Sequence, residues 1–170
     1  TNRRQRQMCI RDRDGRVVAL LELEDERSRV RLVPDLGGAI ADMDAKLSSR
    51  LAPVLRRWDG PQTGWIGVGS NILVPFSNRI SGGGFYFDQG GSATFHPIHP
   101  NVENLDPFPL HGDGLLKSWQ VVSHSSTDVI LRLVNGEIGD FLYTAEVRYL
   151  LSSGTLNITL RVTNKGIRLD

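Results

Sequence analysis

The chain has almost no cysteine and no excess of charge of either sign. Cys9 is the single cysteine among 170 residues, so one chain can form neither a disulfide nor a thiolate zinc site. Twenty basic and nineteen acidic side chains leave a formal charge of +1, which argues against nucleic acid and other strongly charged partners. These absences favour a small, uncharged partner.

Long apolar runs and helical periods are also missing. No run approaches the roughly 18–20 residues that cross a bilayer, and the N-terminus lacks a charged-then-apolar signal pattern. We therefore expect a soluble, cytoplasmic protein with no membrane partner. No long window holds a convincing helical period, although residues 42–55 are ambiguous. The length suits one domain around a single core.

The first thirteen residues contain five arginines and one acidic residue. A basic arm for phosphates is one interpretation, but no aromatic residues are interleaved with the arginines. Residues 7–13 resemble translated sequencing-adapter DNA. We expect residues 1–16 to be a non-native or disordered leader and the domain to begin at residue 17.

From residue 17 onward, short apolar runs alternate with turn residues. The last run alternates apolar and polar residues strictly, which is typical of a strand with one solvated face. The predicted strands cover residues 17–24, 29–33, 53–57, 72–74, 85–87, 119–123, 127–134, 141–151 and 156–163. The class is all-β, antiparallel and sandwich-like.

One stretch brings polar residues to a predicted strand end. Pro75 ends the apolar run 72–74, so Asn78 and Arg79 fall on the turn that follows. Arg79 carries a planar fork of donors that can grip two neighbouring hydroxyls. His111, about thirty residues on, can donate or accept near neutral pH. One interpretation is that the three residues bind one polar ligand. The other is purely structural: Asn78 closes a turn, Arg79 pairs with a carboxylate and His111 caps a loop.

Other patterns carry less chemistry. His96 and His99 are spaced like metal ligands, but Pro97 and Pro100 predict an extended loop in which the two side chains diverge. We expect no metal site. His124 falls in a predicted hairpin turn and is expected to be solvated. No nucleophile elbow is present, and the glycines near residue 67 lack the rest of a dinucleotide fingerprint.

Several aromatic residues have two open interpretations. They could offer flat apolar faces for a sugar ring, or they could belong to the core, which is commoner in a β-sandwich. Composition does not decide between these alternatives. The residues concerned are Trp65, Phe85, Tyr86 and Trp119.

The residues assembled so far resemble the aldose 1-epimerase, or galactose mutarotase, family. The resemblance covers about residues 17–164, in the family's order and spacing. It rests on Pro34-Asp-Leu-Gly-Gly38, Leu73-Val-Pro-Phe-Ser-Asn-Arg-Ile80, Gly84-Phe-Tyr-Phe87, Leu110-His-Gly112 with Trp119 after it, and Val162-Thr-Asn164.

The resemblance implies an antiparallel β-supersandwich and an isomerase that interconverts the α and β anomers of free aldohexoses, such as galactose or glucose, without a cofactor. A carboxylate takes the proton of the anomeric hydroxyl while a histidine protonates the ring oxygen; the ring opens, turns about C1–C2 and closes. It implies that Asn78 and Arg79 bind sugar hydroxyls. His111, the catalytic candidate, would support the ring oxygen or an adjacent hydroxyl.

The family's acid histidine follows the strand that here ends at Asn164, and its base glutamate lies near the family's C-terminus. The resemblance therefore implies that residues 17–170 are the N-terminal part of a single β-sandwich domain, with little or no activity alone. Its last strand, residues 156–162, would be an exposed edge that promotes association.

Two other functions remain open. One is a non-catalytic carbohydrate-binding β-sandwich, or the β-sandwich part of a larger glycoside-processing enzyme. The other is a hexose-6-phosphate mutarotase, which needs additional basic residues for the phosphate. Arg56 and Arg57 are the one local basic pair that the sequence offers.

Overall fold

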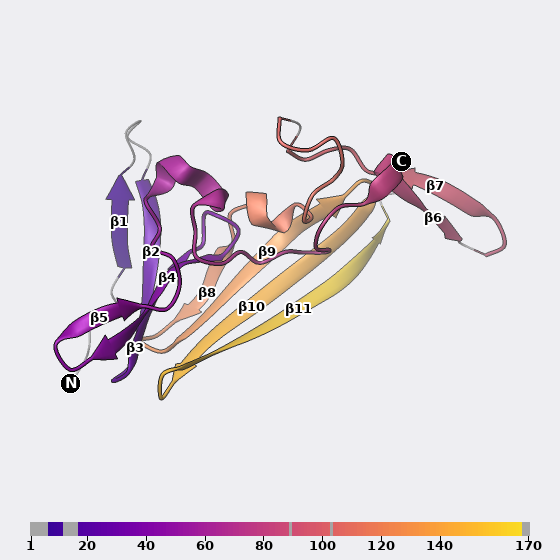
Figure 1. The fold of residues 1–170 in the computed structure, drawn as a ribbon. Coiled ribbons are helices and arrows are strands. Elements are labelled where there is room, and N and C mark those ends of the chain that lie inside the picture. Colours follow the sequence, from indigo (N-terminus) through magenta and orange to yellow (C-terminus); the bar gives the residue numbers. More distant parts are fainter. Residues whose placement is uncertain (1–6, 12–16, 89, 103, 168–170) are drawn as a thin grey trace.

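Two antiparallel sheets and a projecting hairpin make up the fold (Figure 1). A computed structural model describes residues 7–11, 17–88, 90–102 and 104–167. The first sheet has the strand order β1-β2-β3-β4-β5, the second has the order β11-β10-β9-β8, and β6 pairs with β7 alone. All of these pairs are antiparallel, so the predicted all-β antiparallel class is confirmed.

The strands of the first sheet are β1 (Gln7–Arg11), β2 (Val17–Glu24), β3 (Ser28–Val33), β4 (Ala39–Leu47) and β5 (Arg50–Pro53). The hairpin is β6 (Gly84–Asp88) and β7 (Ala93–Pro97), and the second sheet is β8 (Gln120–His124), β9 (Asp128–Ile138), β10 (Phe141–Ser152) and β11 (Thr155–Ile167). Three short 3-10 turns, η1 (Pro61–Ile66), η2 (Ser81–Gly83) and η3 (Gly114–Leu116), connect them. No helix in the described residues is long and apolar enough to cross a membrane.

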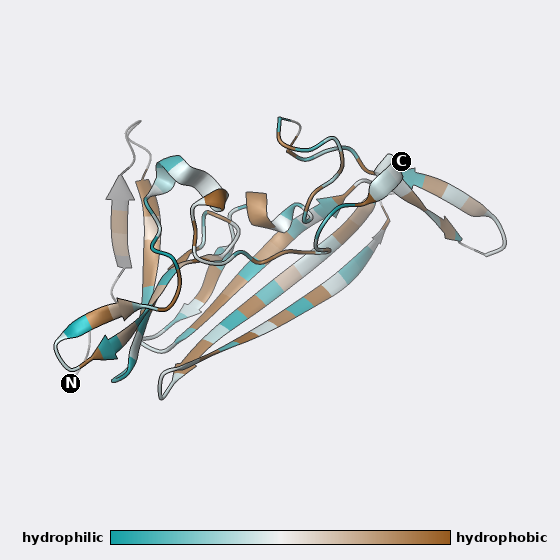
Figure 2. Cartoon of the chain, viewed as in Figure 1, coloured by the Kyte–Doolittle hydropathy of each residue, from teal (hydrophilic) through white to brown (hydrophobic). Residues whose placement is uncertain are grey.

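Most predicted strands are confirmed because their hydropathy alternates with period two, as the bands along β9, β10 and β11 show (Figure 2). Two predictions were wrong. The strand predicted at residues 53–57 ends at Pro53 and begins at Arg50. Residues 72–74 form no strand, although Val74 is buried. A short apolar run can therefore pack on the core as irregular chain.

The expected leader lies largely outside the described residues. Gln7–Arg11, however, form β1, which pairs with β2 from Gln7 opposite Leu21 to Arg11 opposite Val17. Residues 7–11 of the expected leader therefore have regular structure, and the expectation that the leader is non-native stays a prediction. Cys9 is exposed on this strand as a free thiol.

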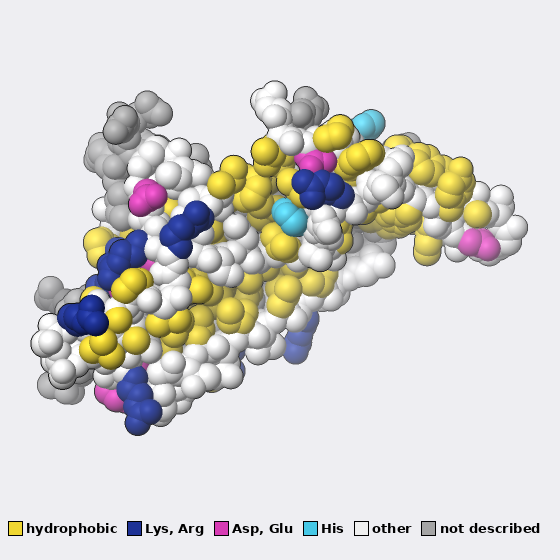
Figure 3. Space-filling view, viewed as in Figure 1, with side chains coloured by type: hydrophobic (Ala, Val, Ile, Leu, Met, Phe, Trp, Pro, Cys, Tyr) yellow, Lys and Arg dark blue, Asp and Glu magenta, His cyan; other side chains and the backbone are white. Residues whose placement is uncertain are grey.

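Charged side chains occupy part of the outer face of the first sheet. Asp42 and Asp44 are fully buried there, and each is paired with arginine: Asp42 with Arg31, and Asp44 with Arg29 and Arg57 at 2.6 and 2.7 Å. Basic and acidic side chains gather at this end of the molecule (Figure 3). Buried carboxylates need such partners because an unpaired buried charge is costly.

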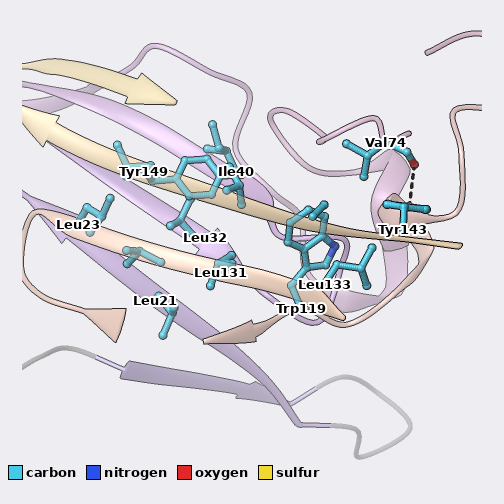
Figure 4. Packing of buried hydrophobic residues seen from close by; sticks show 14 of the residues in the cluster. Leu21, Leu23, Leu32, Ile40, Val74, Trp119, Leu131, Leu133, Tyr143 and Tyr149 are labelled. Carbon is cyan, nitrogen blue, oxygen red and sulfur yellow. Dashed lines mark hydrogen bonds between the residues drawn. The ribbon is translucent and has the colours of Figure 1, made fainter. Parts of the chain in front are cut away.

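The main core lies between the two sheets (Figure 4). Five of its residues are fully buried: Leu23 and Leu32 of the first sheet and Leu131, Val147 and Tyr149 of the second sheet. The Tyr149 hydroxyl donates to the carbonyl of Gly38 at 2.6 Å, and burial raises its pKa. This hydrogen bond satisfies the phenol inside the core and ties β10 to the loop before β4.

A buried carboxylate joins the turns of the two sheets. Oδ1 of Asp25, in the β2–β3 turn, accepts from the N–H groups of Arg27 and Ser28, and Oδ2 accepts from the N–H of Gly154 in the β10–β11 turn, all at 2.7–2.8 Å. Burial alone would raise the pKa of Asp25, but these three backbone donors outweigh it and hold the pKa below its usual value.

We expect Asp25→Ala to lower the free energy of unfolding by about 2–4 kcal/mol at pH 7, because three charge-assisted hydrogen bonds are lost together. A depressed folded-state pKa stabilises the fold above the unfolded-state pKa, and this stabilisation is lost as pH falls through the folded value. The difference between wild type and variant should therefore shrink below about pH 4. Urea unfolding between pH 7 and pH 2 measures it.

Asp59→Ala is the control for this prediction, since Asp59 is exposed. It should change stability by less than about 0.5 kcal/mol at every pH. A pH-independent difference between wild type and Asp25→Ala would contradict a role for the ionised carboxylate.

Candidate functional site

The structure brings Asn78, Arg79 and His111 together where two irregular segments cross. Arg79 pairs with Leu110 as an isolated antiparallel bridge, and the N–H of Ile80 donates to the carbonyl of Pro109 at 3.3 Å. These contacts join the loop after Pro75 to the segment that leads into η3. Residues thirty apart in sequence thus share one small surface.

Asn78 and His111 hold each other through two hydrogen bonds. The backbone N–H of His111 donates to the carbonyl of Asn78 at 2.8 Å, and the N–H of Asn78 donates to Nδ1 of His111, also at 2.8 Å. Both residues have left-handed backbones, with φ of 66° and 60°. That conformation costs a non-glycine residue about 1–2 kcal/mol, and such strain concentrates at functional sites.

The second of these bonds sets the tautomer of His111. Because Nδ1 accepts a hydrogen bond from a backbone N–H, its lone pair is engaged and the neutral ring carries its proton on Nε2. Protonation of Nδ1 would place two N–H groups against each other. The neutral ring of His111 therefore offers Nε2–H as a donor.

Asp106 orients the guanidinium of Arg79. Nε of Arg79 donates to Oδ2 of Asp106 at 2.5 Å, and Nη1 donates to Oδ1 of Asn78 at 3.2 Å. The carboxylate is 6% exposed and the arginine 49% exposed. The N–H of Phe108, and then Arg79, hold the pKa of Asp106 below its usual value despite its burial. Sequence reasoning missed Asp106, which no motif marked.

The arrangement presents hydrogen-bond donors to solvent. Asp106 accepts from Nε of Arg79 and Oδ1 of Asn78 accepts one N–H of Nη1, so the remaining N–H groups of the guanidinium can donate beside the side-chain amide of Asn78 and Nε2–H of His111. Basic, acidic and histidine side chains meet amid apolar ones on this face (Figure 3). Such a set suits the hydroxyl and ring oxygens of a polar ligand.

Asn101 and Gly112 fix the segment that carries His111. The side chain of Asn101 donates to the carbonyls of Leu110 and Gly112, at 2.8 and 2.6 Å, and accepts from the N–H of Leu110 at 2.8 Å. Gly112 has φ of 72°, and a Cβ atom there would lie 1.9 Å from the carbonyl oxygen of Val74. Only glycine allows the two segments to approach this closely.

A buried network supports the same segment from the second sheet. The Tyr143 hydroxyl lies 3.2 Å from the carbonyl oxygen of Val74 (Figure 4) and 2.5 Å from Oδ1 of Asp113. Oδ2 of Asp113 accepts from the N–H of Glu137 at 2.9 Å and pairs with Lys117 at 2.7 Å. Burial raises the pKa of Tyr143 and Asp113 raises it further, so the phenol remains a donor.

The other histidines considered in the sequence, His96 and His124, have structural contacts. His96 lies on strand β7 instead of the predicted loop, with its ring 4.9 Å from that of Phe141 and its Nδ1 3.6 Å from Asp140. His124, predicted to be solvated in a turn, ends β8 half-buried, 3.3 Å from the carbonyl of Glu22. Within the described part of the chain, no group of three or more potential ligands could hold a metal ion.

The aromatic candidates divide between core and surface. Trp119 is buried and its Nε1–H donates to the carbonyl of Gly114 at 2.9 Å, so it belongs to the core. Trp65 and Phe85 are half-buried. Tyr86 is exposed on the projecting hairpin, where its ring centroid lies 5.2 Å from that of Phe95.

The basic pair considered for a phosphate is already engaged. Arg57 pairs with buried Asp44 at 2.7 Å, and Arg56 donates to the carbonyls of Ile66 and Val68 at 2.5 and 3.1 Å. Both arginines therefore brace the loop beside the first sheet. These contacts give no support to a hexose-6-phosphate site.

Comparison with solved structures defines the class of this protein as a mostly antiparallel, galactose mutarotase-like β fold. A putative aldose 1-epimerase from Escherichia coli K12 superposes with a TM-score of 0.74 at 31% identity, over 88% of this chain and 47% of that one. A GalM/aldose epimerase homologue from C. elegans (TM-score 0.70, 18% identity, 87% and 46%) and a galactose mutarotase-like protein from Clostridium acetobutylicum (0.61, 19%, 96% and 50%) share the fold.

The chain belongs to the aldose 1-epimerase family, whose model matches residues 19–169. The uncharacterized protein YphB of Escherichia coli K12 is 43% identical over 94 residues, which are 55% of this chain and 30% of YphB. This chain thus spans about half the length of the solved structures it matches. The family resemblance inferred from the sequence motifs is confirmed.

Proposed function

We propose that this chain forms the substrate-binding wall of an aldose 1-epimerase site for a free aldohexose. Arg79 and Asn78 bind sugar hydroxyls, and Nε2–H of His111 donates to the ring oxygen or an adjacent hydroxyl. The observation that carries the proposal is a fixed set of hydrogen-bond donors. Asp106 orients the guanidinium of Arg79, and two hydrogen bonds between Asn78 and His111 orient these two residues. A ligand rich in oxygen acceptors and without net charge matches it.

The acid histidine and base glutamate implied by the family lie beyond the motifs of this chain. The carboxylate in the cluster, Asp106, is committed to Arg79 and to the N–H of Phe108, so it is a poor base for the anomeric hydroxyl. We therefore propose that the chain alone binds sugar without appreciable turnover. The wider function, anomer interconversion, belongs to a site completed by those two groups.

Titration with galactose and glucose, followed through the backbone amide signals of residues 76–80 and 110–112 in an NMR spectrum, tests the proposal. Arg79→Met should weaken binding by about tenfold or more, since a lost charge-assisted hydrogen bond costs about 1.5–3 kcal/mol. Arg132→Met is the matched control, because Arg132 is 48% exposed and pairs with Glu146 on the second sheet. Equal affinities of both variants would contradict the site.

Polarimetry of fresh α-galactose tests the predicted lack of turnover. The chain should leave the rate of mutarotation at its uncatalysed value. Catalysed mutarotation that His111→Ala abolishes would show that this chain carries its own acid and base. Sequencing the source DNA beyond the codon for Asp170 separates the alternatives: a following histidine and distal glutamate favour the epimerase, and their absence favours a non-catalytic carbohydrate-binding sandwich.

A further inference from the structure

One aromatic residue is bonded directly to the carboxylate of the candidate site. The backbone N–H of Phe108 donates to Oδ1 of Asp106 at 3.0 Å, and Oδ2 of the same carboxylate accepts from Nε of Arg79 at 2.5 Å. Three residues further along the chain, the backbone N–H of His111 donates to the carbonyl of Asn78 at 2.8 Å. Phe108 therefore belongs to the segment that connects the two halves of the donor set.

The backbone around Phe108 is held in place. Pro107 and Pro109 flank this residue, and a residue that precedes a proline is restricted to extended conformations. The carbonyl of Pro109 accepts from the N–H of Ile80 at 3.3 Å. A segment fixed in this way presents its side chain to a ligand without a large loss of conformational entropy.

Part of the Phe108 ring lies at the surface. The side chain is 37% exposed, whereas Pro109 and Leu110, which follow it, are buried. On the face that carries the site, apolar side chains border the charged residues and the histidine (Figure 3). An apolar surface next to hydrogen-bond donors is the combination that a sugar requires, because a sugar has both hydroxyl groups and carbon-bound hydrogens.

The aromatic residues considered in the sequence have other surroundings. Trp119 is buried in the core, and the ring of Phe85 stacks on that of Phe141 with centroids 5.1 Å apart. Tyr86 lies on the projecting hairpin. Phe108 shares one carboxylate with the guanidinium of the site, and no sequence motif marked it.

We propose that Phe108 is the stacking residue of this site and selects a sugar in its ring form. This inference rests on the proposed function. The aromatic ring packs on the apolar C–H face of the pyranose while Arg79 and Asn78 bind its hydroxyls. Both surfaces leave water when they meet, which favours binding. An open-chain polyol has similar hydroxyls but no fixed apolar face, so it gains little from Phe108.

Phe108→Leu tests the stacking, because leucine is apolar but has no aromatic ring. In the NMR titration of residues 76–80 and 110–112, this variant should bind galactose about five- to tenfold more weakly than wild type. Its affinity for galactitol, the open-chain polyol, should fall by less than about twofold. Phe108→Tyr keeps the ring and should bind galactose as wild type does. Phe95→Leu is the matched control, since Phe95 is 41% exposed on the projecting hairpin, and it should change neither affinity.

Ring-current shifts separate stacking from a purely structural role of Phe108. The C–H proton signals of bound galactose should move upfield with wild type and with Phe108→Tyr, but not with Phe108→Leu. An unchanged galactose affinity of Phe108→Leu overturns this inference and leaves the proposed function standing. Equal affinities of wild type for galactose and galactitol also overturn it, and this comparison needs no variant. If wild type binds neither ligand, the proposed function fails and this inference fails with it.

Discussion

Replacing Gly112 by alanine is expected to lower the free energy of unfolding by about 3–5 kcal/mol. Two effects add up: alanine is strained in the left-handed backbone conformation at this position, and its side chain overlaps a neighbouring carbonyl group. The new Cβ atom would lie 1.9 Å from the carbonyl oxygen of Val74. That carbonyl cannot easily move, because it accepts from the N–H of Gly114 and contacts the Tyr143 hydroxyl. Urea unfolding followed by circular dichroism measures the loss.

Gly82→Ala separates the two causes. Gly82 has φ of 77°, close to the value of Gly112, but no neighbouring atom lies within 4 Å of its Cβ position. It should cost about 1–2 kcal/mol from backbone strain alone. If both variants lost the same stability, close approach of the two segments would not be the reason for glycine at position 112. Gly112→Ala should also displace His111 and thereby abolish the proposed binding of sugar.

Trp119→Ala is expected to cost about 3–5 kcal/mol, a large part of the stability of a small domain. Trp119 is 3% exposed and contacts the core residues of both sheets. Its ring lies against Gly38, and its Nε1–H donates to the carbonyl of Gly114. It therefore joins the glycine loop before β4 to the segment that carries His111. Thermal unfolding measures the effect.

Trp119→Phe divides that effect between packing and hydrogen bonding. Phenylalanine keeps part of the ring but lacks the donor, so we expect a loss of about 1–2 kcal/mol. Trp65→Ala should cost less than Trp119→Ala, since Trp65 is only half-buried. A loss below about 1 kcal/mol for Trp119→Ala would contradict its place in the core.

Local hydropathy patterns predicted the strands well where the patterned segment also has another strand to pair with. Residues 17–24 were predicted as a strand and β2 has those bounds, because alternation and turn residues are local signals. Residues 72–74 looked equally apolar, but in the part of the chain that the structure describes they pair with no strand. Apolarity predicts burial, and a strand also requires a partner that one segment cannot specify.

The candidate site was predicted in part. Asn78, Arg79 and His111 stood out because strand ends and arginine, asparagine and histidine side chains suit polar ligands, and the structure brings them together. Asp106 and Asn101 carried no such signal, since an aspartate and an asparagine in a long loop are unremarkable in sequence. Their roles depend on which segment the loop crosses, and that crossing is tertiary.

The sequence by itself determined the all-β antiparallel class, the family and the residue types of a donor-rich site, because period-two hydropathy and short motifs are written along the chain. Only the tertiary structure decided which nitrogen of His111 carries the proton and which carboxylate orients Arg79. These features arise from contacts between residues far apart in sequence. Chain folding creates them, and no local pattern records them.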